Sequence, residues 1–324
     1  VSNVAQIHVW LTELEMRKEV FYAVLPQFHV FGLTVNTLLA VRVQALMVLF
    51  PQLDGSVTEA MVATPPTVFI AAPPMFHGVG IQARAREIKP TGMKYCISGA
   101  SKLSQETVNL WEGQFGGMLN EGYGMTESSP VTFINPYSQA RKVGTIGICI
   151  SNTDFKVVSV TDPTVEVAQG EAGELLVRGP QVFSGYWNNP VETELALLPG
   201  GWLRTGDVVT VDDDGFVTIV DRLKEIVITS GLNVSPTEVE QVLVQHPAIA
   251  EAAVVGEPDI ARGERVIAAV VLAEGAELDV REVKDFCKDK LAAHKIPRKF
   301  TVLEALPKTG LGKVQRRVVR EMLT

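Results

Sequence analysis

Cysteine is scarce in this chain of 324 residues, which has only Cys96, Cys149 and Cys287. The number is odd and the three lie far apart, so the sequence offers neither a disulfide framework nor the spacing of a zinc site. Scattered cysteines of this kind are typical of reduced intracellular proteins, and we therefore predict a cytoplasmic location. The five histidines are equally scattered, and no pair has the spacing of metal ligands.

Basic residues are not in excess either. Lys and Arg number 29 against 37 Asp and Glu, and the formal net charge is −8 at pH 7. A protein that binds nucleic acid needs a basic stripe, so this composition argues against nucleic acid as a partner.

A long uninterrupted apolar run is missing as well. The longest apolar stretch, residues 33–50, contains Asn36, Arg42 and Gln44, and such side chains are costly inside a bilayer. We predict there a buried helix that runs into a strand, and no transmembrane segment. Peripheral contact with a membrane surface is compatible with this pattern. The first residues do not have the pattern of a signal peptide.

The composition that is present belongs to an ordinary folded protein, with 46% hydrophobic and 20% charged residues. In residues 1–143, short apolar runs alternate with helical patterns, which is typical of an α/β layer with a mainly parallel sheet. Ligands bind beyond the carboxyl ends of such strands. The loops after Leu25, Ile97 and Leu119 are therefore the predicted places for chemistry. The apolar runs are VFYAVLP (20–26), TVFIAAP (67–73) and KYCIS (94–98).

Two further segments have different patterns. Residues 144–221 contain short strands separated by Gly, Pro and Asp, which predict a small antiparallel β subdomain. Asp213-Asp214-Gly215 is a hairpin-turn signal within it, because the acidic run lacks the spacing of a calcium loop. Residues 222–324 are predicted to form a small α+β domain.

Helix signals are clear in this last segment. Ser235, with Pro236 and Glu238 after it, has the pattern of a capping box, and a second helix begins near Asp279. A short basic helix ends the chain. The cations in and before it are predicted to form a solvated face; they are Lys308, Arg316, Arg317 and Arg320.

The strongest local motif is EGYGMTE at 121–127. Its two glycines permit a tight turn and a close approach of the backbone to a ligand. The aromatic ring, hydroxyl and carboxylate that follow suit a base, a phosphate oxygen and Mg²⁺ respectively. Taken alone, such a loop is more often a simple turn, so the other motifs of the chain decide its interpretation.

Seven motif blocks occur along the chain: LPQFHVFG (25–32), SGASKLS (98–104), EGYGMTESSP (121–130), GELLVRGPQVFSGYW (173–187), GWLRTGD (201–207), DRLKEIVITSGLNVSPTEVE (221–240) and PKTGLGK (307–313). In type and order they resemble the core motifs of the adenylate-forming superfamily. This superfamily includes acyl-CoA synthetases, aryl-CoA ligases, luciferases and peptide-synthetase adenylation domains. The resemblance covers essentially the whole chain, and the common order of the blocks argues against chance.

The resemblance implies a two-step ligase reaction. A carboxylate attacks the α-phosphate of Mg-ATP to give acyl-AMP and pyrophosphate, and the thiol of coenzyme A then attacks the acyl-AMP. The implied cofactors and substrates are Mg²⁺, ATP and coenzyme A. Because both reactants of the first step are anions, the site needs fixed cations and donors aimed at phosphate.

Several roles carry over to the first part of the chain. Tyr123 is expected to stack on the adenine, with Gly124 in the same nucleotide-binding loop. Thr126 is expected to contact phosphate and Glu127 to bind Mg²⁺, both as catalytic residues. His29 is expected to line the acyl site. The loop beside the adenine comprises Ser98, Gly99, Ala100 and Ser101.

The second part of the chain receives five further roles. Asp207 resembles the carboxylate that accepts both ribose hydroxyls, the alternative being a turn residue. Arg222 is expected to reach the ribose or a phosphate, the alternative being a surface salt bridge. Lys224 matches the hinge of the mobile C-terminal domain, and Gly231 lies on its coenzyme A side. Lys313 resembles the mobile catalytic lysine, which bridges the attacking carboxylate and the α-phosphate.

One departure from the family stands out. The family has an upstream loop rich in Ser, Thr and Gly that ends in Lys and cradles the β- and γ-phosphates, and these 324 residues contain no such loop. The chain also begins at Val1 within a helical pattern. We therefore predict an N-terminally truncated member: a remnant of the large α/β adenylate-forming domain with its antiparallel subdomain, then the mobile domain. The chain alone is predicted to be inactive.

Three interpretations of the function of this chain stay open. The block at 221–240, followed by a complete C-terminal domain, is most similar to fatty acyl-CoA synthetases. An aryl-CoA ligase or another carboxylate-adenylating enzyme is the alternative. An amino-acid activator is disfavoured, because no Asp stands in the loop of His29 to pair a substrate amine. An inactive module that binds a nucleotide or an acyl group is the non-enzymatic alternative.

Overall fold

The computed structural model describes residues 1–309 and 312–323. The chain forms two compact units. The first comprises Val1–Thr205 and Thr210–Ile219, and the second comprises Gly206–Val209 and Val220–Thr324. Within the described ranges, no helix has the length and apolarity to cross a membrane. The domain limits given above, 1–143, 144–221 and 222–324, stay predictions.

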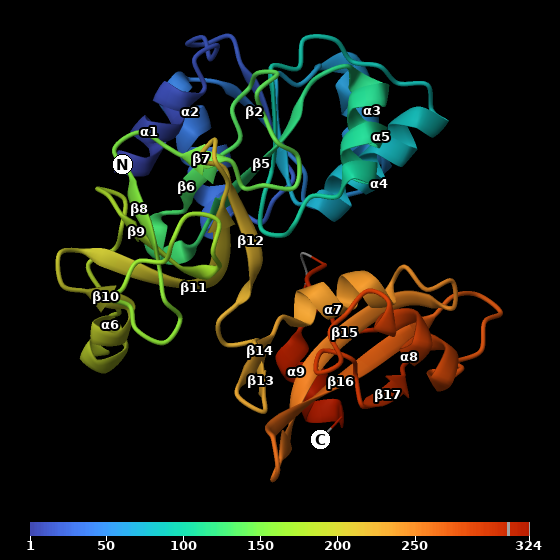
Figure 1. The fold of residues 1–324 in the computed structure, drawn as a ribbon. Helices are drawn as coiled ribbons and strands as arrows, with labels where there is room; N and C mark the ends of the chain where they lie inside the picture. The colour runs from blue at the N-terminus through green and yellow to red at the C-terminus, as the bar shows by residue number, and fades with distance from the viewer. Residues whose placement is uncertain (310–311, 324) are drawn as a thin grey trace. The chain divides into compact units, whose positions relative to one another are not determined.

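A seven-stranded sheet forms the centre of the first unit (Figure 1). The first five strands in spatial order pair in parallel, and each of the last two pairs antiparallel with the strand before it. This arrangement confirms the predicted mainly parallel α/β sheet. The three apolar runs of the sequence become β1, β3 and β4. In spatial order the strands are β2 (Leu46–Leu49), β1 (Val20–Ala23), β3 (Val68–Ala71), β4 (Tyr95–Ser98), β5 (Leu119–Gly124), β6 (Val131–Ile134) and β7 (Ile148–Cys149).

Helices cover both faces of this sheet. Figure 1 shows α3, α4 and α5 together on one side, with α1 and α2 on the other. The side of α3–α5 buries an aromatic cluster in which Phe69, Phe76 and Trp111 meet at centroid distances of 4.6–5.4 Å. The helices are α1 (Ser2–Trp10), a π-helix η1 (Gly32–Leu38), α2 (Leu39–Val43), α3 (Gly55–Ala63), α4 (Pro73–Ala85) and α5 (Gln105–Phe115). The helix and strand predicted within 33–50 are thus confirmed.

The antiparallel sheet predicted after the first layer is also present. Its hairpin turn lies at Asp213-Asp214, where Lys142 Nζ binds Asp212 and Asp214, each at 2.6 Å. The acidic run therefore stabilises a turn, as predicted. The elements are β8 (Asp154–Val158), β9 (Gly173–Arg178), α6 (Pro190–Ala196), β10 (Leu197–Leu198), β11 (Trp202–Val211) and β12 (Val217–Arg222).

The second unit is built on a separate sheet of five strands, with helices on both of its faces. Side chains alternate along β15, so Val254 packs toward α7 and α8 while Ala253 and Val255 pack toward α9. The strands are β13 (Val227–Thr229), β14 (Leu232–Val234), β15 (Ile249–Asp259), β16 (Gly263–Leu272) and β17 (Lys299–Val302). The helices are α7 (Pro236–Leu243), α8 (Val280–Lys288) and α9 (Arg316–Leu323).

The predicted caps of this unit form, with one correction. Asp279 accepts hydrogen bonds from two backbone N–H groups at the start of α8, and the Ser235 hydroxyl accepts from Glu238 N at 3.2 Å. The capping box is only half made, because the Glu238 carboxylate binds Lys295 at 2.7 Å. A nearby ammonium is a stronger partner for a carboxylate than a backbone amide.

Candidate active site

Three loops converge at the carboxyl ends of the parallel strands in the first unit. Ser98 of β4 pairs with Ala71 of β3 and Glu121 of β5, so these strand ends lie side by side. A Cβ on Gly99 would lie 2.9 Å from the Phe31 ring and 3.4 Å from Gly122 O. The segments that carry His29, Ser98–Ser101 and the EGYGMTE motif therefore pack against one another.

The loop after β1 holds His29 in a defined orientation. His29 Nδ1 accepts a hydrogen bond from Phe31 N at 3.2 Å. The loop then closes tightly, since a Cβ on Gly32 would lie 2.4 Å from Pro26 O. This geometry leaves His29 partly exposed, consistent with a lining residue, and its acyl-site role stays a prediction.

The predicted adenine loop, residues 98–101, is exposed to solvent only at Ala100 and Ser101. Ser98 is fully buried, and its hydroxyl has no hydrogen-bond partner within the described part of the chain. Ala100 is exposed with φ 71°, a left-handed conformation that is uncommon for alanine, and Ser101 is partly exposed. A ligand could thus meet Ala100 and Ser101, whereas the Ser98 side chain belongs to the interior.

The EGYGMTE motif forms the end of β5 and the turn after it. Tyr123 is partly exposed, and its ring meets Phe133 edge-on at 6.1 Å. Gly124 needs to be glycine because a Cβ there would lie 1.9 Å from Pro130 O. The close approach of the two backbone segments therefore fixes the course of the chain directly after Tyr123, and the stacking role of Tyr123 stays a prediction.

Thr126 and Glu127 begin a short 3-10 helix, η2 (Thr126–Ser128). Thr126 is exposed, and Glu127 Oε1 accepts a hydrogen bond from the Tyr186 hydroxyl at 2.7 Å. Burial, together with the Glu127 carboxylate, raises the pKa of Tyr186 to about 12, so the phenol stays a donor. Sequence reasoning missed Tyr186, although it stands in one of the motif blocks.

The Glu127 carboxylate could supply only part of the coordination shell of the expected Mg²⁺. Among the described residues, no cluster of three or more His, Cys, Asp or Glu could hold a metal by itself. Magnesium commonly takes one or two protein carboxylates and completes its shell with waters and substrate phosphates. A single carboxylate beside an exposed Thr126 is compatible with this pattern.

A second acidic residue of the motif is buried. Glu121 is 7% exposed, its Oε1 accepts from Leu103 N at 3.3 Å, and its Oε2 has no partner in the described ranges. Burial raises the pKa of Glu121 to about 8. Burial thus favours the protonated form of this side chain near neutral pH, inside the loop cluster that the sequence assigns to the nucleotide.

In the second unit, Asp207 and Arg222 form an ion pair. Arg222 Nε lies 2.9 Å from Asp207 Oδ1, and the Asp207 side chain is 3% exposed while that of Arg222 is 51% exposed. Leu223 N donates to Gly206 O at 2.7 Å and holds the two segments together. The paired strands β11 and β12 thus place side by side two residues that the sequence assigned to the nucleotide.

We expect Asp207→Ala to weaken binding of AMP by about 1.5–3 kcal/mol, the usual cost of losing hydrogen bonds to a charged acceptor. Calorimetric titration with AMP measures the effect. Asp154→Ala is the matched control, because Asp154 is an exposed aspartate that pairs with Arg178 and belongs to no predicted site. An unchanged dissociation constant in Asp207→Ala would mean that Asp207 serves the turn alone.

The predicted hinge and coenzyme A side lie in two turns of this unit. Lys224 is exposed in the turn that follows β12, which closes through Glu225 N donating to Arg222 O at 2.9 Å. Ser230 and Gly231 have φ of 53° and 77° and connect β13 to β14. Two consecutive residues with positive φ are typical of a tight hairpin turn, where glycine relieves strain.

Lys313 is partly buried and lies next to Val314, which forms an antiparallel bridge with Lys308. Thr309 N donates to Lys313 O and Gln315 N to Pro307 O, each at 2.8 Å. Desolvation, and next the charge of Arg222, lower the pKa of Lys313 below that of an ordinary lysine. Residues 310 and 311 of the PKTGLGK motif lie outside the described residues.

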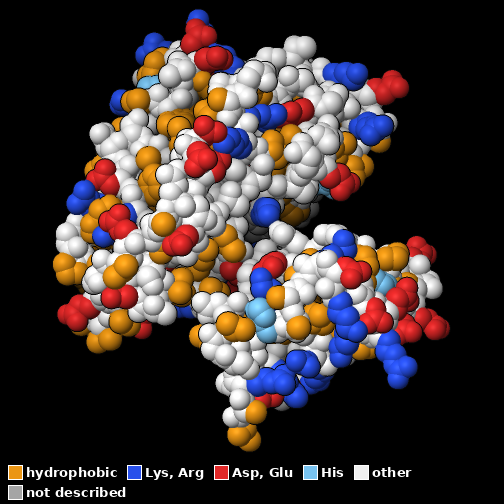
Figure 2. Space-filling view, in the orientation of Figure 1, with side chains coloured by type: hydrophobic (Ala, Val, Ile, Leu, Met, Phe, Trp, Pro, Cys, Tyr) orange, Lys and Arg blue, Asp and Glu red, His pale blue; other side chains and the backbone are white. Residues whose placement is uncertain are grey.

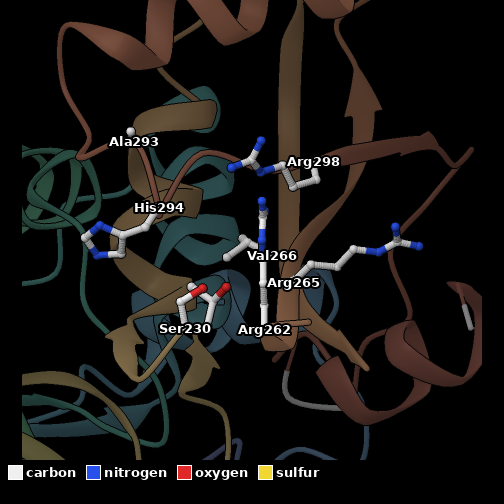
Figure 3. A pocket seen from close by; sticks show the side chains of 8 residues that line it. Ser230, Arg262, Arg265, Val266, Ala293, His294 and Arg298 are labelled. Atoms are coloured by element: carbon white, nitrogen blue, oxygen red, sulfur yellow. The ribbon is translucent and has the colours of Figure 1, made fainter. Parts of the chain in front are cut away.

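A basic cavity lies beside the Gly231 turn. It has a volume of about 290 Å³ and is lined by polar and positively charged side chains from several elements of the second unit (Figure 3). Neither Arg262 nor Arg298 has an ion-pair partner within residues 1–309 and 312–323, whereas Arg265 pairs with Glu257. Figure 2 shows Lys and Arg gathered on the visible face of this unit. The lining residues that carry charge or a hydroxyl are Thr229, Ser230, Arg262, Arg265, His294 and Arg298.

Comparison with known proteins agrees with this geometry. Residues 1–187 match the family model described as AMP-binding enzyme, and residues 238–313 match the AMP-binding enzyme C-terminal domain. The chain therefore belongs to the AMP-binding enzyme family, the adenylate-forming superfamily that the motif blocks indicated.

Relatives and solved structures extend the likeness over almost the whole chain. A long-chain-fatty-acid–CoA ligase of Bacillus subtilis (strain 168) is 38% identical over 99% of this chain and 57% of its own length. A 4-coumarate–CoA ligase of Oryza sativa subsp. japonica is 34% identical over 94% of this chain and 54% of its own. The crystal structure of ATP-bound MatB from Rhodopseudomonas palustris matches with a TM-score of 0.89 and 31% identity, over 99% of this chain and 63% of that one. The chain thus spans a little over half the length of these curated relatives.

Proposed function

We propose that this chain carries the acyl-adenylate site of an AMP-forming acid–CoA ligase. The observation that carries the proposal is the Asp207–Arg222 pair, whose buried carboxylate and half-exposed guanidinium suit a ribose and a phosphate. The convergence of the His29, Gly99 and Tyr123 loops supports a nucleotide and acyl site in the first unit. Family membership supports the reaction class.

Each side chain would contribute a separate physical effect. Tyr123 offers a face to the adenine, and Ala100 and Ser101 offer backbone groups beside it. Glu127, oriented by Tyr186, would hold Mg²⁺, which when bound neutralises phosphate charge. Lys313 would neutralise the negative charge shared by the attacking carboxylate and the α-phosphate. The hinge role of Lys224 is part of the same proposal.

We propose a fatty acid as the carboxylate, because a relative at 38% identity is named a long-chain-fatty-acid–CoA ligase. The relative named 4-coumarate–CoA ligase, at 34% identity, keeps an aromatic acid as the alternative. Titration of this chain with palmitoyl-AMP, acetyl-AMP and 4-coumaroyl-AMP separates the two by affinity. AMP release from each acid, measured in a longer protein that carries this chain, is the matching turnover assay. Preference for the aromatic adenylate would overturn the fatty-acid assignment.

The basic cavity is proposed to receive phosphates of coenzyme A. Coenzyme A carries three phosphates, and guanidinium groups bind phosphate through paired charge-assisted hydrogen bonds. The cavity adjoins Ser230, whose N–H donates to Arg262 O at 2.8 Å, so it is tied to the Gly231 turn that the sequence places on the coenzyme A side.

Combined Arg262→Ala and Arg298→Ala substitution is expected to weaken binding of coenzyme A by about tenfold or more, because hydrogen bonds between charged partners contribute about 1.5–3 kcal/mol each. AMP affinity should not change. Titration calorimetry with coenzyme A and with dephospho-coenzyme A shows which phosphate is bound. Arg317→Ala, which removes an exposed arginine paired on its own helix, is the control. Equal losses in the double variant and the control would contradict the assignment.

A module that binds acyl-adenylate without turning it over is the second candidate. The missing phosphate-cradling loop favours it for these 324 residues taken alone. Tight binding of an acyl-AMP by the chain, with no release of AMP in the presence of coenzyme A, would support binding without catalysis.

A further inference from the structure

The Arg316 side chain is largely, though not fully, buried in the second unit, contrary to the solvated face that the sequence predicted for it. Its side chain is 16% exposed. Nε and one terminal nitrogen donate to the two oxygens of Glu240 at 2.8 and 2.6 Å, and the same nitrogen donates to the Thr237 hydroxyl at 2.9 Å. The other terminal nitrogen binds Glu225 and lies 3.9 Å from Asp221.

The carboxylates around Arg316 are themselves fixed. Glu240 Oε1 also accepts from Val254 N of β15 at 2.7 Å. Asp221 accepts from the Ser235 hydroxyl at 2.6 Å, from Thr237 N at 3.1 Å and from Arg222 N at 2.7 Å. One buried guanidinium therefore connects the end of β12, the turn after it, α7 and the start of α9.

Two predicted nucleotide residues flank this network. Arg222 lies directly between Asp221 and the turn of Glu225, and Lys313 stands three residues before Arg316 in the chain. The other end of the Lys313 segment is held by Lys308, whose ammonium lies 2.6 Å from Glu251 of β15. A segment anchored on both sides loses less conformational freedom when it binds a ligand.

We propose that Arg316 is a positioning residue: it fixes the segment of Lys313 to the segment of Arg222, so that both cations meet one nucleotide. Arg316 itself touches no ligand. The inference rests on the proposed function, because it assumes that Arg222 and Lys313 bind the same nucleotide. Arginine suits this positioning role, because its planar guanidinium donates hydrogen bonds to several carboxylates at once, whereas a lysine ammonium is a compact point charge.

The test separates local coupling from folding. Arg316→Met alone would leave buried carboxylates unpaired, which is strongly destabilising, so it is combined with Glu240→Gln. Arg317→Met is the matched control, because Arg317 is adjacent and its side chain is 81% exposed. Arg316→Lys keeps the charge and is expected to fall between the control and the double variant. Thermal unfolding confirms that each protein is folded.

Two readouts decide the proposal. Trypsin cleavage after Arg222 and Lys224, followed by mass spectrometry, reports the freedom of that segment and is expected to be about tenfold faster in the double variant. AMP affinity should fall by about tenfold, because the segments of Arg222 and Lys313 are then no longer held in place before the nucleotide binds. Cleavage and affinity equal to those of Arg317→Met would overturn the proposal. If the unchanged chain binds no AMP, the proposed function fails for this chain, and cleavage at the control rate would still overturn the coupling.

Discussion

Replacing Lys313 by alanine is expected to slow acyl-adenylate formation by about 10²–10³-fold, comparable to the loss of one oxyanion-stabilising donor in other enzymes. The reason is electrostatic: a carboxylate and a phosphate, both anions, approach each other in this step, and the ammonium neutralises the charge they share. Formation of the thioester from supplied acyl-AMP should change much less. The two half-reactions are measured separately in a preparation that forms acyl-AMP.

Lys288→Ala is the matched control, because Lys288 is an exposed lysine of the same unit that pairs with Asp285 on its own helix. The pH profile provides a second check. Since the pKa of Lys313 is lowered by desolvation and by Arg222, adenylation should decline with rising pH earlier than it would for an ordinary lysine. Equal damage to both half-reactions would contradict the assignment of Lys313 to the first step.

Replacing Glu121 by glutamine is expected to remove much of the decline of stability with rising pH. The pKa of Glu121 is raised from 4.5 to about 8 by burial, so the folded state favours the protonated form. Its stabilising contribution is complete below pH 4.5 and is lost as the pH rises through about 8. Integrated over this window the loss is on the order of 4 kcal/mol for the wild-type chain.

Denaturant unfolding at pH 5, 6.5 and 8 measures this effect. The glutamine variant keeps an acceptor for Leu103 N but adds an amide N–H₂ where Glu121 Oε2 has no partner. It should therefore be no more stable than wild type at pH 5 and more stable at pH 8. Glu106→Gln, an exposed acid at the start of α5, is the control. Parallel pH profiles for wild type and Glu121→Gln would show that Glu121 is ionised in the folded chain.

Local patterns sufficed for most of the fold. The apolar runs at 20–26, 67–73 and 94–98 became the parallel strands β1, β3 and β4, and Ser235 and Asp279 became helix caps. These signals are encoded within a few neighbouring residues, through side-chain periodicity and backbone hydrogen bonding. For the same reason the motif blocks located the loops that meet around Gly99.

Side-chain environments could not be derived in this way. Ser98 was expected beside the adenine, yet its side chain is fully buried. No local pattern indicates that Tyr186 orients Glu127, because the two residues are 59 positions apart in the chain. Both outcomes depend on distant chain segments that no local pattern specifies.

Arg316 shows most clearly where the sequence and the tertiary structure divide. The sequence by itself determined the fold class and the family and singled out Asp207, Arg222 and Lys313 as candidates, because each rests on local patterns or an ordered series of motifs. Only the tertiary structure decided that Arg316 is buried among carboxylates drawn from β12, the following turn and α7. The pattern of a short basic helix predicts exposure to solvent. Whether a charged side chain is buried depends instead on partners that are distant in the sequence, and only the tertiary structure shows them.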